Sequence, residues 1–194
     1  MKTLLTLLVL FFSSSVVAED ISDFQIEGIS IGDSLLDYFS EDEIKKGKRN
    51  YKYKNDEFFT VEIYEEPSFN QYQNLSFRLK SNDTKYLIYG LSGFDFIDNS
   101  NNECFDKVDI VTNEISKILD ENKKIQSIRN HDADPTGKSK IKKVEWWFES
   151  NDLITVECWD WSKQISKNKG WGDNFSVTFL TEEYMKWINL FYKN

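Results

Sequence analysis

The chain has 194 residues, a net charge of −9 and an aromatic fraction of 15%. A surface this acidic repels phosphate backbones and anionic lipid headgroups, which argues against nucleic acid as a partner. The many large aromatic side chains supply enough apolar area for a packed interior, so general disorder is also excluded.

Residues 1–18 are predicted to be a signal peptide. Lys2 precedes an apolar run from Leu4 to Phe12, and Val16-Val17-Ala18 is the small-residue pattern that signal peptidase cleaves. This run is too short to span a bilayer as a helix. We therefore expect an exported protein, periplasmic or extracellular. Its mature part, residues 19–194, should form a single α+β domain without membrane insertion.

The mature chain is expected to open with a short strand and two short helices. Alternation over residues 24–28 predicts the strand. Asp33 or Ser34 can cap the first helix, and Ser40 with Glu43 has the spacing of a capping box for the second.

The stretch Ile-Glu-Gly-Ile-Ser-Ile-Gly-Asp-Ser, residues 26–34, resembles the opening of many small exported proteins of AT-rich bacteria whose activity is unassigned. The resemblance implies a strand, a turn and a helix in an envelope setting. It implies no activity, because function depends on sites and not on such short local patterns.

Three strands are predicted next, over residues 59–63, 75–79 and 86–90. In each, apolar and polar residues alternate, and clusters of turn-forming residues separate the strands. Short connections of this kind indicate an antiparallel meander. A further strand at 175–179 and a C-terminal helix capped by Thr181 complete the elements expected near the end of the chain.

A long amphipathic helix is predicted from Glu103 to Leu119. Its apolar residues recur at spacings of four and three along one stripe that includes Cys104. Cys158 falls at an inward position of a later strand, so the two cysteines should meet when the helix packs on the sheet. An oxidising compartment favours a Cys104–Cys158 disulfide. The alternative is two separate buried thiols.

A β-hairpin is predicted from two alternating segments, 144–148 and 154–158, with a turn between them. If the apolar residues face inward, alternation places Trp147, Trp159 and Trp161 on the opposite face. Three tryptophans on one surface would form a binding site for a ligand or partner. The alternative is that the C-terminal helix or the Trp171 loop covers this face.

No catalytic residue, metal ligand or cofactor is assigned from the sequence. His131 is the only histidine and lies with Asp132 and Asp134 in an expected loop, residues 130–143, but no nucleophile motif accompanies it. The run Asp98–Glu103 partly matches a calcium loop, yet lacks its glycine and its closing glutamate.

The resulting expectation is a noncatalytic binding or interaction module. Its partner would be another protein or a small apolar or sugar-like ligand. The alternative is a hydrolase that uses carboxylates, with or without a metal. An exposed tryptophan face favours binding, whereas carboxylates that converge with His131 favour chemistry.

Overall fold

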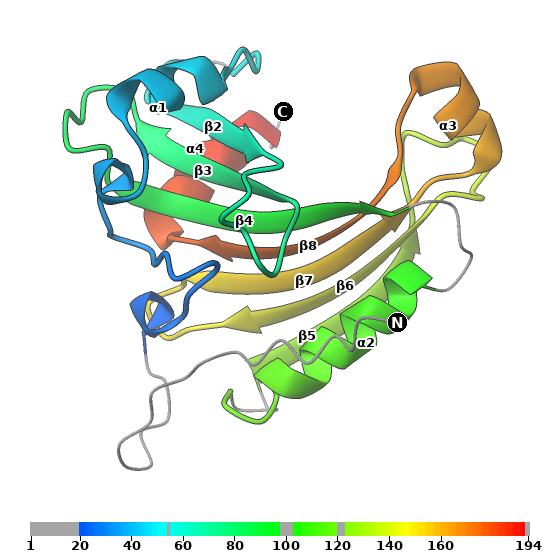
Figure 1. Ribbon diagram of the computed structural model, residues 1–194. Helices are drawn as coiled ribbons and strands as arrows, with labels where there is room; N and C mark the ends of the chain where they lie inside the picture. Colours follow the sequence, from blue (N-terminus) through cyan, green and yellow to red (C-terminus); the bar gives the residue numbers. More distant parts are fainter. Residues whose placement is uncertain (1–19, 54, 98–102, 120–122, 193–194) are drawn as a thin grey trace.

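The computed structural model describes residues 20–53, 55–97, 103–119 and 123–192 (Figure 1). The predicted signal peptide and most of the partial calcium loop, residues 98–102, lie outside the described residues. Within the described part, no helix is both long and apolar enough to cross a bilayer.

One antiparallel sheet organises the fold, as expected for an α+β protein. Its eight strands lie in the order β1-β2-β3-β4-β8-β7-β6-β5. Their bounds are β1 Lys48–Arg49, β2 Phe58–Tyr64, β3 Asn74–Lys80, β4 Ile88–Ile97, β5 Lys124–Asn130, β6 Lys140–Trp147, β7 Leu153–Asp160 and β8 Asp173–Leu180. The predicted meander and hairpin are both confirmed as neighbouring strand pairs.

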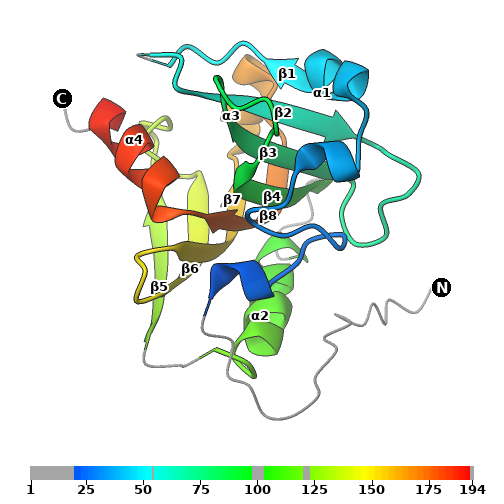
Figure 2. The same cartoon turned by 90° about the vertical axis from the view of Figure 1, so that its left-hand side faces the viewer.

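The described residues form four α-helices: α1 Glu41–Gly47, α2 Glu103–Ile115, α3 Lys163–Lys169 and α4 Glu182–Tyr192. Helices α1, α2 and α4 pack on the sheet, whereas α3 lies in the connection between β7 and β8 beyond the end of the sheet (Figure 1). Helices α2 and α4 lie on opposite sides of the sheet (Figure 2). We call the side that carries α2 the inner face and the other side the outer face. Ser40 and Glu43 form the expected capping box of α1.

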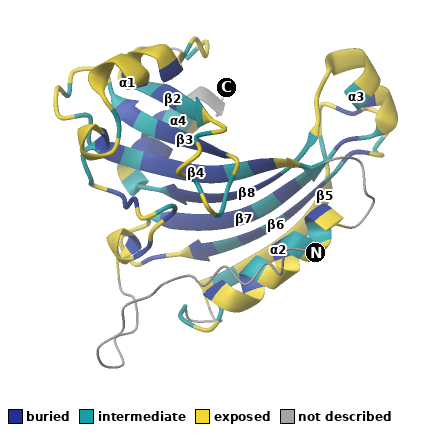
Figure 3. Cartoon of the chain, viewed as in Figure 1, coloured by how far each residue is buried: buried dark blue, intermediate teal, exposed yellow. Residues whose placement is uncertain are grey.

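The main hydrophobic core lies between the inner face and α2 together with the N-terminal segment. Most residues of the central strands are buried, and Figure 3 colours them dark blue. The core includes Phe77, Val108, Trp146, Val156 and Phe175. A smaller cluster on the outer face packs α4 onto the sheet through the rings of Phe58, Tyr184 and Trp187.

The predicted Cys104–Cys158 disulfide joins α2 to β7, with the two Cα atoms 5.8 Å apart. An ion pair reinforces this attachment, since the Lys142 ammonium lies 2.5 Å from the Asp109 carboxylate and also donates to the Phe105 carbonyl. Lys142 is buried on the inner face, so its charge requires such a partner.

Several expected elements differ from the structure. The expected strand over 24–28 is wrong: Ile26 and Ile29 form an isolated bridge around a turn whose central residues, Glu27 and Gly28, both have positive φ. The long helix ends at Ile115 instead of Leu119. The expected loop 130–143 is shorter, because β6 already begins at Lys140. The strands β1 and β5 and the helix α3 were not anticipated.

Replacing both cysteines by alanine should destabilise the fold by about 4 kcal/mol, because the disulfide closes a loop of more than 50 residues in the unfolded chain. Urea unfolding of the oxidised protein and of the double variant Cys104→Ala/Cys158→Ala measures this difference. Equal free energies of unfolding would show that the disulfide does not stabilise the fold.

Candidate functional site

A group of aromatic side chains lies where β7 ends and β8 begins. Ring centroids of His131 and Trp161 are 4.2 Å apart, and those of Trp161 and Trp171 are 4.7 Å apart. Trp159 completes the group, at 4.9 Å from His131 and 5.8 Å from Trp161. We call these four residues the tryptophan cluster.

Three chain segments meet to build this cluster. Trp159 points to the outer face near the end of β7, directly across from Ile141 of β6. His131 follows β5 on the same face, and its backbone N–H donates to the Ser139 carbonyl, which extends the β5–β6 pairing. Trp171 comes from the connection between α3 and β8.

The Asp134 carboxylate fixes the loop that carries His131. It accepts hydrogen bonds from the Ser139 hydroxyl at 2.7 Å, from the Thr136 hydroxyl at 2.7 Å and from the Ser162 hydroxyl at 2.8 Å. These bonds, first that of Ser139, hold the pKa of Asp134 well below its ordinary range. Because Ser162 also caps α3, one carboxylate connects the loop, β7 and α3.

The four rings differ in exposure, and this difference separates structural from accessible members. Trp161 is only 6% exposed and lies between His131 and Trp171 as packing. Trp171 is 40% exposed and presents a ring to solvent. Trp159 and His131 are half-buried. The accessible surface of the cluster is therefore carried mainly by Trp171.

His131 is held in this arrangement by its backbone and ring contacts. Burial lowers the pKa of its imidazole below the ordinary value, with a smaller contribution from Arg129 in the same direction. The imidazole is thus neutral at pH 7. Its Nδ1 accepts the Ala133 N–H at 3.0 Å. The other neighbours of the ring are Trp159 and Trp161, so no nucleophile lies in the described contacts of His131.

A second row of rings extends the aromatic surface along the outer face. Tyr64, Phe94 and Phe96 stack edge to face, with centroid separations of 6.0 and 5.8 Å. Phe96 is 54% exposed. A Cβ placed on Gly172 would lie 3.9 Å from the Phe96 ring, so this aromatic row adjoins the Trp171 loop.

The three tryptophans predicted to share a surface are only partly brought together. Trp159 and Trp161 are neighbours in the cluster. Trp147 lies on the same face, but at the opposite end of β6 from Ile141, the residue that pairs with Trp159. Six residues of extended strand separate those positions, about 20 Å at 3.3 Å per residue. Trp147 is therefore a separate, 39% exposed ring.

Two carboxylates with raised pKa values, Asp160 and Asp173, lie on the other face. Asp160 and Asp173 follow the inward alternation of Cys158 and Phe175. Burial raises the pKa of both, and the charge of Asp173 raises that of Asp160 further. They do not converge with His131, which is on the outer face. Among the described residues, no three His, Cys, Asp or Glu side chains lie together as a metal site would require.

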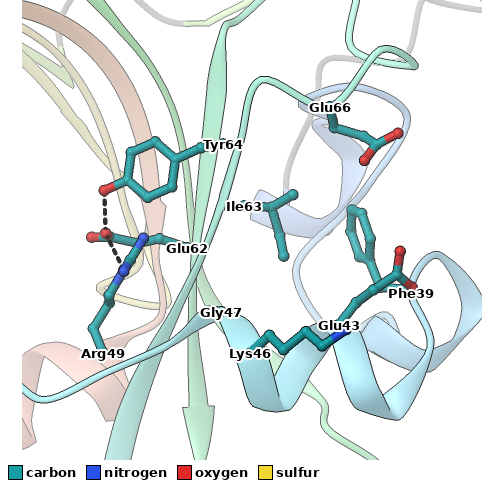
Figure 4. Close-up of a pocket in the computed structure, with 9 residues that line it drawn as sticks. All are labelled: Phe39, Glu43, Lys46, Gly47, Arg49, Glu62, Ile63, Tyr64 and Glu66. Carbon is teal, nitrogen blue, oxygen red and sulfur yellow. Dashed lines mark hydrogen bonds and ion pairs between the residues drawn. The ribbon is translucent and has the colours of Figure 1, made fainter.

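A shallow surface pocket of about 250 Å³ lies beside β2, distant in sequence from the cluster (Figure 4). The Glu62 carboxylate dominates it chemically and accepts bonds from Arg49, Tyr51 and Tyr64. Its acceptor positions are thus already used within the protein. Tyr64, the last ring of the aromatic row, also lines this pocket.

The sequence alone did not indicate that this surface also includes Trp171, Phe96 and Tyr64. Phe94 and Phe96 alternate with Asp95 and Ile97, a signal that would have extended the third meander strand past Gly90. Trp171 lies in a connection, where periodicity carries no information about side-chain direction.

Comparisons of the chain with protein-family models, curated proteins and solved structures gave no match.

Trp161→Ala should destabilise the fold by about 3–5 kcal/mol, because it removes a buried ring from between its neighbours. Trp171→Ala removes a ring that is 40% exposed and should cost less than half as much. Denaturant unfolding of the two variants gives the comparison. Similar losses in both would contradict the division into packing and accessible rings.

Asp160→Asn should raise the melting temperature at pH 7. The raised pKa means that the ionised carboxylate is disfavoured in the folded state. The wild type therefore loses stability as pH rises above about 4, the pKa of an aspartate side chain in the unfolded chain. The gain should vanish near about pH 3, where both states are protonated. Asp132→Asn, at an exposed loop carboxylate, is the control. A gain that persists at the lower pH would exclude the ionisation mechanism.

Proposed function

We propose that the protein is an exported, noncatalytic binding module that holds a ring-bearing, sugar-like ligand on the outer face of its sheet. The observation that carries this proposal is the meeting of the tryptophan cluster with the aromatic row. Together they present accessible rings of Trp171, Phe96 and Tyr64 on one side of the molecule.

Export is supported by the leader-like N-terminal sequence and by the disulfide. Residues 1–18 have the charge, apolar run and small-residue site of a signal peptide. The Cys104–Cys158 bridge is typical of proteins that mature in an oxidising compartment. Both observations favour the periplasm or the cell exterior.

The chemistry of the surface favours a ligand with both apolar and polar groups. Exposed aromatic rings bind the apolar faces of sugar rings, and neighbouring amides bind hydroxyl groups. Asn174 supplies such an amide, because its register places it between Phe96 of β4 and Trp159 of β7 on the outer face. The outer face thus alternates ring, amide and ring across three adjacent strands.

The hydrolase alternative has less support. The two carboxylates with raised pKa lie on the inner face, while the aromatic surface and His131 lie on the outer face. The Asp173 carboxylate also accepts the Trp161 backbone N–H at 2.7 Å, so a structural contact already engages one of its oxygens. Both cysteines are joined in the disulfide, which removes them as nucleophiles.

Calorimetric titration with neutral oligosaccharides built from glucose and from N-acetylglucosamine tests the proposal. At least one should give saturable binding to the wild type. Trp171→Ala should then weaken binding about tenfold, or about 1.4 kcal/mol, by removing one stacking face. Phe96→Ala should act in the same direction.

Trp147→Ala is the matched control, because Trp147 is a similarly exposed tryptophan on the same face but outside the cluster. This variant should bind as the wild type does. The proposal is wrong if no oligosaccharide binds, or if Trp147→Ala weakens binding as much as Trp171→Ala.

A further inference from the structure

Strand β5 forms one edge of the sheet and leaves one side of its backbone open. It is the last strand in the sheet order and pairs only with β6. Six of its seven residues are exposed. Ile125 and Ile128 are 54% and 59% exposed, on opposite faces of the strand. Nothing in the described part of the chain pairs with its outer side.

The direction of each backbone group in β5 follows from the pairing. The His131 N–H donates to the Ser139 carbonyl, so His131 points toward β6. Backbone direction alternates along an antiparallel strand, and the same direction therefore holds for Ser127 and Arg129. The N–H and C=O groups of Gln126 and Ile128, between them, point away from the sheet.

This edge lacks most of the features by which edge strands avoid pairing with the strands of other molecules. It is seven residues long, contains no proline, and pairs with β6 without a register shift. The opposite edge is different: β1 has two residues, and Gly47 approaches the β2 backbone so closely that an added Cβ would lie 2.8 Å from the Glu62 carbonyl oxygen. Only β5 therefore presents a long, regular edge.

The segment that forms this edge is basic in sequence, although the whole chain is acidic. Carboxylates elsewhere in the protein already pair with Lys123, Lys142 and Lys143, so the charge at the edge is that of β5 itself. Residues 123–143 contain seven basic and two acidic residues, in a chain with a net charge of −9. Within β5 itself, Lys124 and Arg129 are the only charged residues. Pairing of β5 with a second copy of β5 would bring two such basic strands together, which is unfavourable.

We propose that β5 is a docking edge for an extended, acidic segment of a partner polypeptide, which adds a ninth strand to the sheet. The outward N–H and C=O groups of Gln126 and Ile128 would supply the main-chain hydrogen bonds. Acidic side chains of the partner would lie opposite Lys124 and Arg129, and apolar ones beside Ile125 and Ile128. This surface does not depend on the aromatic rings.

The test uses a capped seven-residue peptide, Thr-Glu-Val-Thr-Thr-Val-Glu, and a matched peptide with lysine in place of both glutamates. In antiparallel pairing its glutamates lie opposite Arg129 and Lys124, and its valines lie opposite Ile128 and Ile125. At low ionic strength the glutamate peptide should bind the full chain at least about tenfold more tightly. Hydrogen exchange of the Gln126 and Ile128 amides should slow on binding, because these donors then become hydrogen-bonded. Absence of saturable binding, or equal binding of both peptides, overturns the proposal.

Two variants separate main-chain pairing from side-chain contact. Ile128→Pro removes an outward N–H without breaking the β5–β6 ladder, which edge strands tolerate, and should weaken peptide binding at least about tenfold. Ile128→Thr keeps the N–H and should retain most of the affinity. Equal binding by the two variants contradicts the proposal, and so does a wild-type dimer in sedimentation that Ile128→Pro converts to a monomer. Trp171→Ala should leave peptide binding unchanged, which distinguishes this site from the aromatic one.

Discussion

The attachment of α2 to β7 determines which side of the sheet becomes the interior. Because the disulfide and the Lys142–Asp109 ion pair both lie on one face, the strands must direct Cys158, Val156 and their neighbours toward α2. Because side chains alternate along a strand, Glu157 and Trp159 must then point to the other side of the sheet. A register slip of one residue in β7 would bury those side chains and expose the core. The side chains on the outer face are thus determined by the packing of α2 on the inner face.

The outer face is divided along its length between two kinds of aromatic packing. At one end, α4 covers Phe58 through Tyr184 and Trp187 and forms a closed cluster. At the other end the rings are held by loops and not by a helix, so some of them remain accessible. The Asp134 carboxylate makes this second arrangement rigid, since its hydroxyl and amide donors come from the loop and from the start of α3. Rigid placement of exposed rings reduces the entropy that a ligand must overcome on binding.

Elements with strong periodicity could be predicted from the sequence, and the others could not. The α2 stripe and the alternation of β6, β7 and β8 each gave the correct element, and the two cysteine positions followed from those patterns. Strand β5 was missed because Ile125 and Ile128 are three residues apart and lie on opposite faces, a spacing that predicts no strand. Helix α3 is short and polar, with one buried apolar residue, Ile165. Trp161 follows the end of β7, where alternation no longer fixes direction, so its burial depended on tertiary contacts with His131 and Trp171.

The same physical reason explains why neither proposed site could be predicted from the sequence. An edge strand exposes both faces and therefore lacks the apolar alternation that marks an inner strand. Exposed rings in a connection, such as Trp171, have no periodic context either. Core positions are specified redundantly, by pattern and by packing, whereas a surface that binds something must stay incompletely paired within its own chain. The accessible rings are only partly packed by this chain, and the outward amides of β5 have no strand of this chain beside them among the described residues. Both proposed sites were therefore found from the three-dimensional arrangement and not from the sequence pattern.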